Sequence, residues 1–203
     1  MDNKKVMFQR KISSFSHIAR KKVNQGFSSF PPGKKGQVWI ETVIYTLIGL
    51  AVIGILLAVA MPKINSMKDK IAIEKSIESL DLINDKINAV RNAPGNRREI
   101  SLDISKGKFI IDSENDKLIW EIPSSYKYSE PGVEVVNGNL KILTTESNPW
   151  TIRIWTDYNV DITFDNTDTM NTKEFEKAST SYTFYIENMG LVDNKVVVDL
   201  REG

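Results

Sequence analysis

Lys34-Lys35-Gly36-Gln37-Val38-Trp39-Ile40-Glu41 stands immediately before the apolar run Thr42–Met61, and these two stretches decide the fold. The run holds 20 residues without a charge, and Lys63 ends it. A helix of that length spans about 30 Å, which is the thickness of the hydrocarbon core of a bilayer. The sequence therefore predicts a helix over residues 37–62 that crosses a membrane.

The charge of the chain is divided at the same place. Residues 1–36 hold nine Lys/Arg and one Asp, whereas residues 37–203 hold the remaining 18 Lys/Arg and 25 Asp/Glu. Basic residues beside a membrane span are typical of its cytoplasmic side. We therefore expect residues 1–36 to be a basic cytoplasmic leader and the acidic remainder to be exported. A basic leader can also bind nucleic acid, but its place beside the span favours topology, and no nucleic-acid partner is expected.

Composition also limits the chemistry. The chain has no cysteine, and its one histidine, His17, lies in the basic leader. Disulfides and thiolate sites are excluded, and in a body without the leader so are imidazole-based triads and zinc sites. We expect no catalytic residue, no cofactor and no metal. Four aspartates resemble a calcium site only weakly, because they lack the alternating spacing of a calcium loop: Asp157, Asp161, Asp165 and Asp168.

A second helical pattern follows the apolar run. Apolar residues recur there at intervals of three and four, which places them on one face of a helix: Ile73, Ile77, Leu80, Ile83, Ile87 and Val90. Pro94-Gly95 is a helix stop signal. We expect an amphipathic helix over residues 63–95, outside the membrane. Its apolar face is predicted to pack on the β domain of the same chain, or against other subunits.

From residue 96 the apolar pattern has a period of two. It predicts strands over Glu99–Ile104, Lys108–Asp112, Lys117–Ile122, Val133–Val136, Leu140–Thr144, Thr151–Trp155, Val160–Phe164, Ser181–Glu187 and Lys195–Leu200. Asn137-Gly138 and Ser105-Lys106-Gly107 are hairpin signals, which favour an antiparallel sheet. The predicted fold is α+β: a long N-terminal helix, membrane-spanning in its first half, followed by an antiparallel β-sheet domain over residues 96–203.

Six aromatic residues are expected in the core or on a sheet face, with a binding platform as the alternative: Trp120, Trp150, Trp155, Phe164, Phe184 and Tyr185.

One segment of the chain consists of Lys34, Lys35, Gly36 and Gln37, followed by Glu41 and the apolar run. This segment resembles the N-terminus of type IV pilins and pilin-like proteins. The similarity is greatest to the archaeal type, whose class III signal peptide carries a Lys-Gly-Gln prepilin processing site. The motif covers residues 34–62, and the order of helix then sheet extends the resemblance loosely over the rest. It implies cleavage between Gly36 and Gln37 by a prepilin peptidase, and assembly with other pilin subunits into an adhesive surface filament.

Physical chemistry gives these residues matching roles. A glycine at position 36 lets an extended backbone fit a protease cleft, and Lys34 and Lys35 hold the site at the cytoplasmic surface. Glu41 costs a few kcal/mol in contact with lipid unless a cation reaches it. Cleavage creates a charged α-amino group at Gln37. The resemblance implies that Glu41 pairs with this amino group on a neighbouring subunit.

Other interpretations remain open. The span can be an uncleaved signal anchor, with Glu41 reaching the headgroups. Ala58-Val59-Ala60 fits ordinary signal peptidase, which would release a soluble protein beginning at Met61. The main alternative function is a membrane-anchored β domain that never polymerises and acts as a binding or adhesion module. An exported enzyme that uses carboxylates alone is a further possibility.

Overall fold

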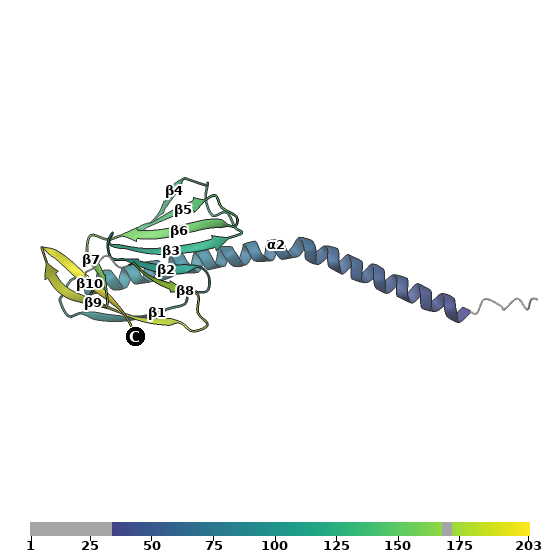
Figure 1. Ribbon diagram of the computed structural model, residues 1–203, viewed down its shortest axis with the longest axis horizontal. Helices are drawn as coiled ribbons and strands as arrows, with labels where there is room; N and C mark the ends of the chain where they lie inside the picture. Colours follow the sequence, from purple (N-terminus) through teal and green to yellow (C-terminus); the bar gives the residue numbers. More distant parts are fainter. Residues whose placement is uncertain (1–33, 168–171) are drawn as a thin grey trace, which may run out of the picture. The chain divides into compact units, whose positions relative to one another are not determined.

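The computed structural model describes residues 34–167 and 172–203, with side chains from Val38 onward (Figure 1). The predicted basic leader therefore lies outside the described residues, except for its last three positions. Two units are distinguished, one ending at Gly54 and one over Ile55–Gly203.

The long helix α2 runs from Lys34 to Val90 and includes Pro62 in its interior. The predicted amphipathic helix extended to residue 95, but α2 ends five residues earlier. Pro94 cannot donate the backbone hydrogen bond that a further turn requires, and Gly95 adopts a positive φ of 77°. Gly95 donates its N–H to the carbonyl of Asn188 at 2.8 Å, so the chain leaves the helix directly onto the β domain.

In the part of the chain that the structure describes, ten strands follow α2 and form two sheets. The large sheet is entirely antiparallel, with neighbours in the order β4 (Glu134–Asn137), β5 (Leu140–Thr145), β6 (Trp150–Asp157), β3 (Lys117–Ser124), β2 (Lys108–Asp112) and β8 (Thr172–Glu176). The small sheet has the order β1 (Arg97–Leu102), β9 (Tyr182–Val192), β10 (Lys195–Glu202) and β7 (Asp161–Phe164). The α+β prediction of a long helix followed by a β-sheet domain is confirmed.

Three details differ from the predicted sheet. The segment Ser105-Lys106-Gly107 is not a hairpin turn, because β1 pairs with β9 and β2 belongs to the large sheet. Strand β8 was not predicted, because charged residues dominate it and only Phe175 is buried. Strands β10 and β7 form one parallel pair, since β7 reaches β10 through the later strands β8 and β9 and not through a hairpin.

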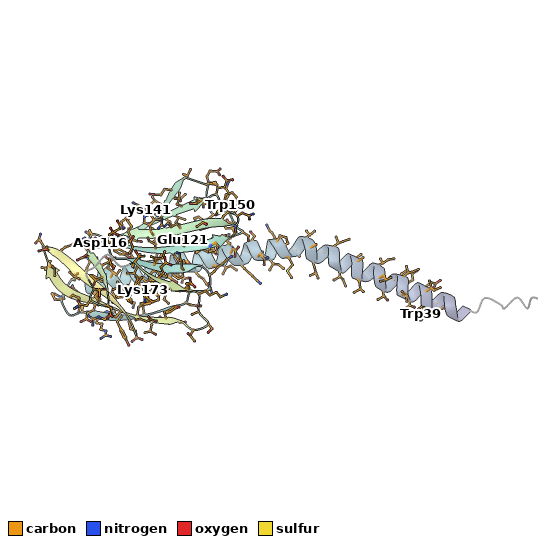
Figure 2. All side chains as sticks on the ribbon, viewed as in Figure 1. Trp39, Asp116, Glu121, Lys141, Trp150 and Lys173 are labelled. Atoms are coloured by element: carbon orange, nitrogen blue, oxygen red, sulfur yellow. The ribbon has the colours of Figure 1, made fainter. Side chains whose placement is uncertain are left out.

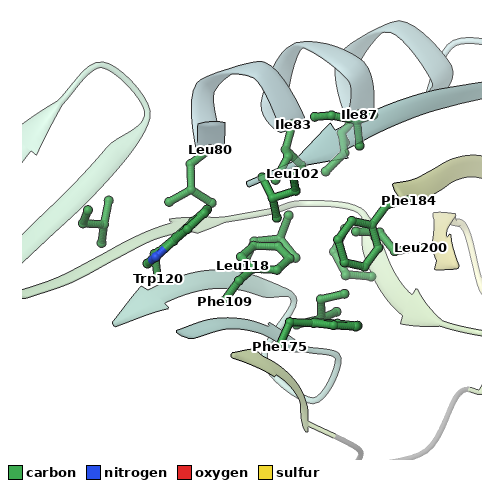
Figure 3. Close-up of a cluster of buried hydrophobic side chains, with 14 of the residues drawn as sticks. Leu80, Ile83, Ile87, Leu102, Phe109, Leu118, Trp120, Phe175, Phe184 and Leu200 are labelled. Carbon is green, nitrogen blue, oxygen red and sulfur yellow. The ribbon is translucent and has the colours of Figure 1, made fainter. Parts of the chain in front are cut away.

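The predicted apolar face of α2 packs on the β domain of the same chain. Ile73, Leu80, Ile83, Ile87 and Val90 are at most 1% exposed. They share one hydrophobic cluster with the inner faces of the strands, and Ile77 packs against that cluster. Figure 3 shows the side chains of Leu80, Ile83 and Ile87 directed from the helix toward the strands.

The aromatic residues divide between the core and the sheet faces, as expected. Trp120 and Phe184 are buried, with Phe109 between them at ring-centroid distances of 5.6 Å and 6.1 Å (Figure 3). Trp150 and Phe164 are partly buried against the core. Trp155 and Tyr185 are half-buried at alternate positions of β6 and β9, on the faces opposite the core.

Candidate membrane and assembly site

The proposed processing residues lie at the start of α2. The backbone of Lys34, Lys35, Gly36 and Gln37 forms the first turn of the helix, and their side chains are not among those described. Glu41 follows within the next turn and is exposed. The two parts of the motif therefore share one continuous helix.

The segment Thr42–Met61 has the properties of a membrane span. Every large apolar side chain from Val38 to Met61 is exposed, by 37% to 74%, and Trp39 projects from the helix near its beginning (Figure 2). By length and composition, α2 is the one described helix that can cross a bilayer. The structure is thus consistent with a single-pass membrane protein.

Polar side chains at the start of the span differ in whether they have hydrogen-bond partners. The hydroxyl groups of Thr42 and Thr46 donate to the carbonyls of Val38 and Thr42, at 2.9 Å and 2.7 Å. Such bonds within the helix let hydroxyl groups enter lipid. Among residues 38–167 and 172–203, in contrast, the carboxylate of Glu41 has no hydrogen-bond or ion-pair partner. Glu41 is therefore the charged side chain at the start of the span, and it has no partner among the described residues.

An exposed apolar face continues on α2 beyond Pro62. Ile64, Met67 and Ile71 are 42%, 58% and 51% exposed and recur at intervals of three and four residues. Ile73 and the rest of the buried face lie on the opposite side of the helix, against the sheets. This part of α2 thus has one apolar face covered by its own domain and a second one uncovered.

A buried carboxylate, missed from the sequence, fixes the helix to the β domain. Asp69 is only 6% exposed and accepts hydrogen bonds from the Ser125 N–H at 2.6 Å and the Ser125 hydroxyl at 2.7 Å. The ammonium group of Lys106 pairs with its other oxygen. Burial alone would raise the pKa of Asp69, but the hydrogen bonds from Lys106 and Ser125 outweigh it and hold the pKa below its usual value.

One feature of the sequence indicated that Asp69 has partners on the β domain. Asp69 lies four residues before Ile73, on the face of the helix that is otherwise apolar. A carboxylate at such a position needs partners from the surface on which the helix packs. Its partners, however, lie 37 and 56 residues away in the sequence, so they could not be named from local patterns.

The acidic stretch has a structural role in the described residues. Asp157 pairs with Lys141 at 2.7 Å and with Lys117 at 3.3 Å, so two neighbouring strands supply its cations. Asp168 lies outside the described residues. Among residues that the structure describes, no three His, Asp or Glu side chains are grouped to hold a metal ion.

Comparison of the chain with protein-family models, with curated proteins and with solved structures finds no match.

Proposed function

We propose that the chain is a pilin-like structural subunit of an archaeal type IV pilus-like surface filament. Its helix α2 inserts into the membrane, and a prepilin peptidase cuts the chain between Gly36 and Gln37. The basic leader stays cytoplasmic, because Lys34, Lys35 and the other cations of residues 1–36 resist translocation. The acidic β domain is exported and faces the outside of the cell.

The unpartnered carboxylate of Glu41 carries this proposal. It lies next to 20 uncharged residues whose apolar side chains are exposed along the helix. A charged group in contact with hydrocarbon costs a few kcal/mol. The hydroxyl groups of Thr42 and Thr46 find partners in their own helix, whereas Glu41 has none among the described residues. A carboxylate retained at such a cost is explained by a cation from outside the chain.

Cleavage supplies that cation. The cut after Gly36 leaves an α-amino group on Gln37, whose usual pKa of about 8 keeps it charged near neutral pH. In a membrane of low dielectric constant, this amino group and the Glu41 carboxylate of a neighbouring subunit neutralise each other. The same contact sets the axial position of one helix against the next, so the charge pair directs assembly as well as insertion.

One observation favours a second candidate, the membrane-anchored binding module that never polymerises. The apolar stripe from Ile73 to Val90 is already covered by the β domain of the same chain. A single copy therefore folds without a neighbour, and lipid alone can cover the exposed residues of the span.

Replacement of Glu41 by alanine tests the proposal in cells that make the filament. The unpaired amino group then costs more than about 1.4 kcal/mol at each contact, so we expect at least a tenfold loss of filaments in the sheared surface fraction. Processing after Gly36 should persist. The matched control is Glu78→Ala, which removes an exposed carboxylate from α2 outside the span. Equal filament yields from the Glu41→Ala and Glu78→Ala strains would exclude the pairing role.

A further inference from the structure

The face of the large sheet that points away from α2 carries a depression of about 310 Å³. Its lining includes Asn115, Lys117, Ile119, Leu143, Arg153 and Trp155. The strand register brings them together, because Trp155 lies opposite Ile119 and Arg153 lies opposite Leu143. The volume is at the lower end of the range for small-molecule sites.

Two apolar side chains on neighbouring strands, Ile119 and Trp155, line this depression. Ile119 is 4% exposed although it lies on the outer face, so the neighbouring side chains cover it. Trp155 is half-buried beside it, while Ile154 and Thr156, the residues on either side in the strand, are buried on the inner face. The indole is thus held by a rigid strand with part of its surface open to solvent.

Among the described residues that line this site, Arg153 is the one cation available to a ligand. Lys117 and Lys141 both pair with Asp157, and Figure 2 places Lys141 on the large sheet. The carboxylate of Asp112, which also lines the depression, accepts hydrogen bonds from the backbone and side-chain amides of Asn115 at 3.0–3.2 Å. The charged groups around the rim, apart from Arg153, are therefore already occupied.

The guanidinium group of Arg153 is exposed and has no hydrogen-bond or ion-pair partner among residues 38–167 and 172–203. Glu121, which Figure 2 labels on the large sheet, lies on β3. The strand register places it opposite Arg153, but the two form no ion pair in that part of the chain. Arg153 and Trp155 are two positions apart on one face of a strand, so their Cβ atoms are about 7 Å apart. A ligand with a flat apolar face and a carboxylate at its edge fits that spacing.

We infer that this depression binds an acidic saccharide, with a uronic acid residue as the recognised unit. The C–H groups on one face of a pyranose ring are attracted to the negative face of the Trp155 indole. The carboxylate at the edge of the ring accepts the paired N–H groups of Arg153, a geometry that arginine matches well. A neutral sugar can pack on the indole of Trp155 in the same way, but it leaves the guanidinium group of Arg153 without an ion-pair partner.

This binding site is independent of assembly. Strands β2, β3, β5 and β6 and the β2–β3 turn supply its lining residues, and none of them comes from α2. A subunit in a filament and a single anchored copy would therefore bind the saccharide alike, so failure of filament assembly leaves the prediction unchanged.

The test is a titration of the full-length protein in nanodiscs of zwitterionic lipid, followed by tryptophan fluorescence and calorimetry. Trigalacturonate is expected to bind at least tenfold more tightly than maltotriose. Trp155→Ala and Arg153→Gln should each weaken trigalacturonate binding at least tenfold, whereas Glu121→Gln should strengthen it, because it removes a negative charge opposite Arg153 that repels the carboxylate of the ligand. Circular dichroism confirms that each variant is folded, and Arg153→Gln alters only an exposed side chain.

Two variants of the small sheet are the matched controls. Arg98→Gln removes an exposed strand arginine, and Tyr185→Ala removes a half-buried aromatic ring that lies 3.8 Å from the guanidinium of Arg97. Both should bind trigalacturonate like the unaltered protein. No binding, equal affinity for maltotriose, or unchanged affinity in Trp155→Ala and Arg153→Gln would each overturn the inference.

Discussion

Asp69 has two roles at the residue scale, because it interrupts an apolar helix face and also joins that face to the β domain. Its carboxylate contacts Lys106, just before β2, and Ser125, just after β3. Each hydrogen bond to a charged group of this kind contributes about 1.5–3 kcal/mol, and loss of one partner leaves the others buried and unpaired. The contacts of Asp69 with Lys106 and Ser125 therefore fix both the axial position of this part of α2 on the sheets and its rotation about its own axis.

Asp69→Asn should lower the free energy of unfolding at pH 7 by about 1–3 kcal/mol. The pKa of Asp69 is depressed in the folded state, so its contribution is complete above the ordinary aspartate pKa of about 3.9 and disappears as the pH falls through the lower folded value. The difference between the variant and the unaltered protein should therefore shrink below about pH 4. Urea unfolding of the full-length protein in detergent, followed by circular dichroism, measures it.

Asp81→Asn is the control on the same helix. Burial and the nearby charge of Asp85 raise the pKa of Asp81, so its charge does not stabilise the fold and its removal should change stability by less than about 0.5 kcal/mol. A difference for Asp69→Asn that is the same at pH 7 and pH 3 would contradict the role of its charge.

Residues also differ in whether their roles could be predicted from the sequence. Glu41 could be singled out because its cost depends on its immediate neighbours, which form an uncharged run. Asp69 could not be interpreted in this way, because its partners come from distant loops. Trp155 was one of six candidate aromatic residues, and only the pairing of β6 with β3 and β5 showed that Ile119, Leu143 and Arg153 surround it.

At the scale of elements, α2 combines two periodic patterns. The buried face from Ile73 to Val90 was predicted from its spacing, and its packing on the β domain is confirmed. The exposed face of Ile64, Met67 and Ile71 was not predicted, because only packing reveals which apolar positions remain uncovered. A contiguous group of exposed apolar side chains is typical of a surface that a protein partner or a membrane covers.

Ile71→Glu tests whether this exposed face packs against other subunits. A carboxylate there would have to be desolvated between helices, so we expect at least a tenfold loss of filaments in the sheared surface fraction. The unfolding midpoint of the isolated subunit should stay the same, because Ile71 is 51% exposed.

Lys75→Glu is the comparison, since it introduces the same side chain one turn later at an exposed position that is already polar. Its filaments should be normal. Normal filaments from Ile71→Glu as well would favour the membrane-anchored module that never polymerises.

The sequence predicted the pairing of strands that follow each other along the chain, and it failed for strands whose partners lie far away in the sequence. The β4–β5 hairpin follows from its turn residues Asn137-Gly138, and it is present. Strand β1 pairs with β9, which lies about 80 residues further along the chain, so nearby turn signals wrongly suggested β2 as its partner. Strand β8 is an edge strand with one buried residue, Phe175, which leaves almost no apolar period to detect.

At the scale of the whole molecule, each part of the chain has its own physical environment. The segment Thr42–Met61 suits lipid, and the sheets enclose a core that includes one face of α2. The α+β order and the single candidate span could be predicted because they depend on composition and period. Assembly depends on a second copy, so it remains a proposal that rests on Glu41 and on the uncovered face of α2.

The most direct measurement is the intact mass and N-terminal sequence of the protein extracted from membranes of cells that also make a prepilin peptidase. The account predicts a mature chain that begins at Gln37 with a free α-amino group, available to the Glu41 carboxylate of the next subunit. A chain that still begins at Met1, or one that begins at Met61 after the apolar run, would contradict it.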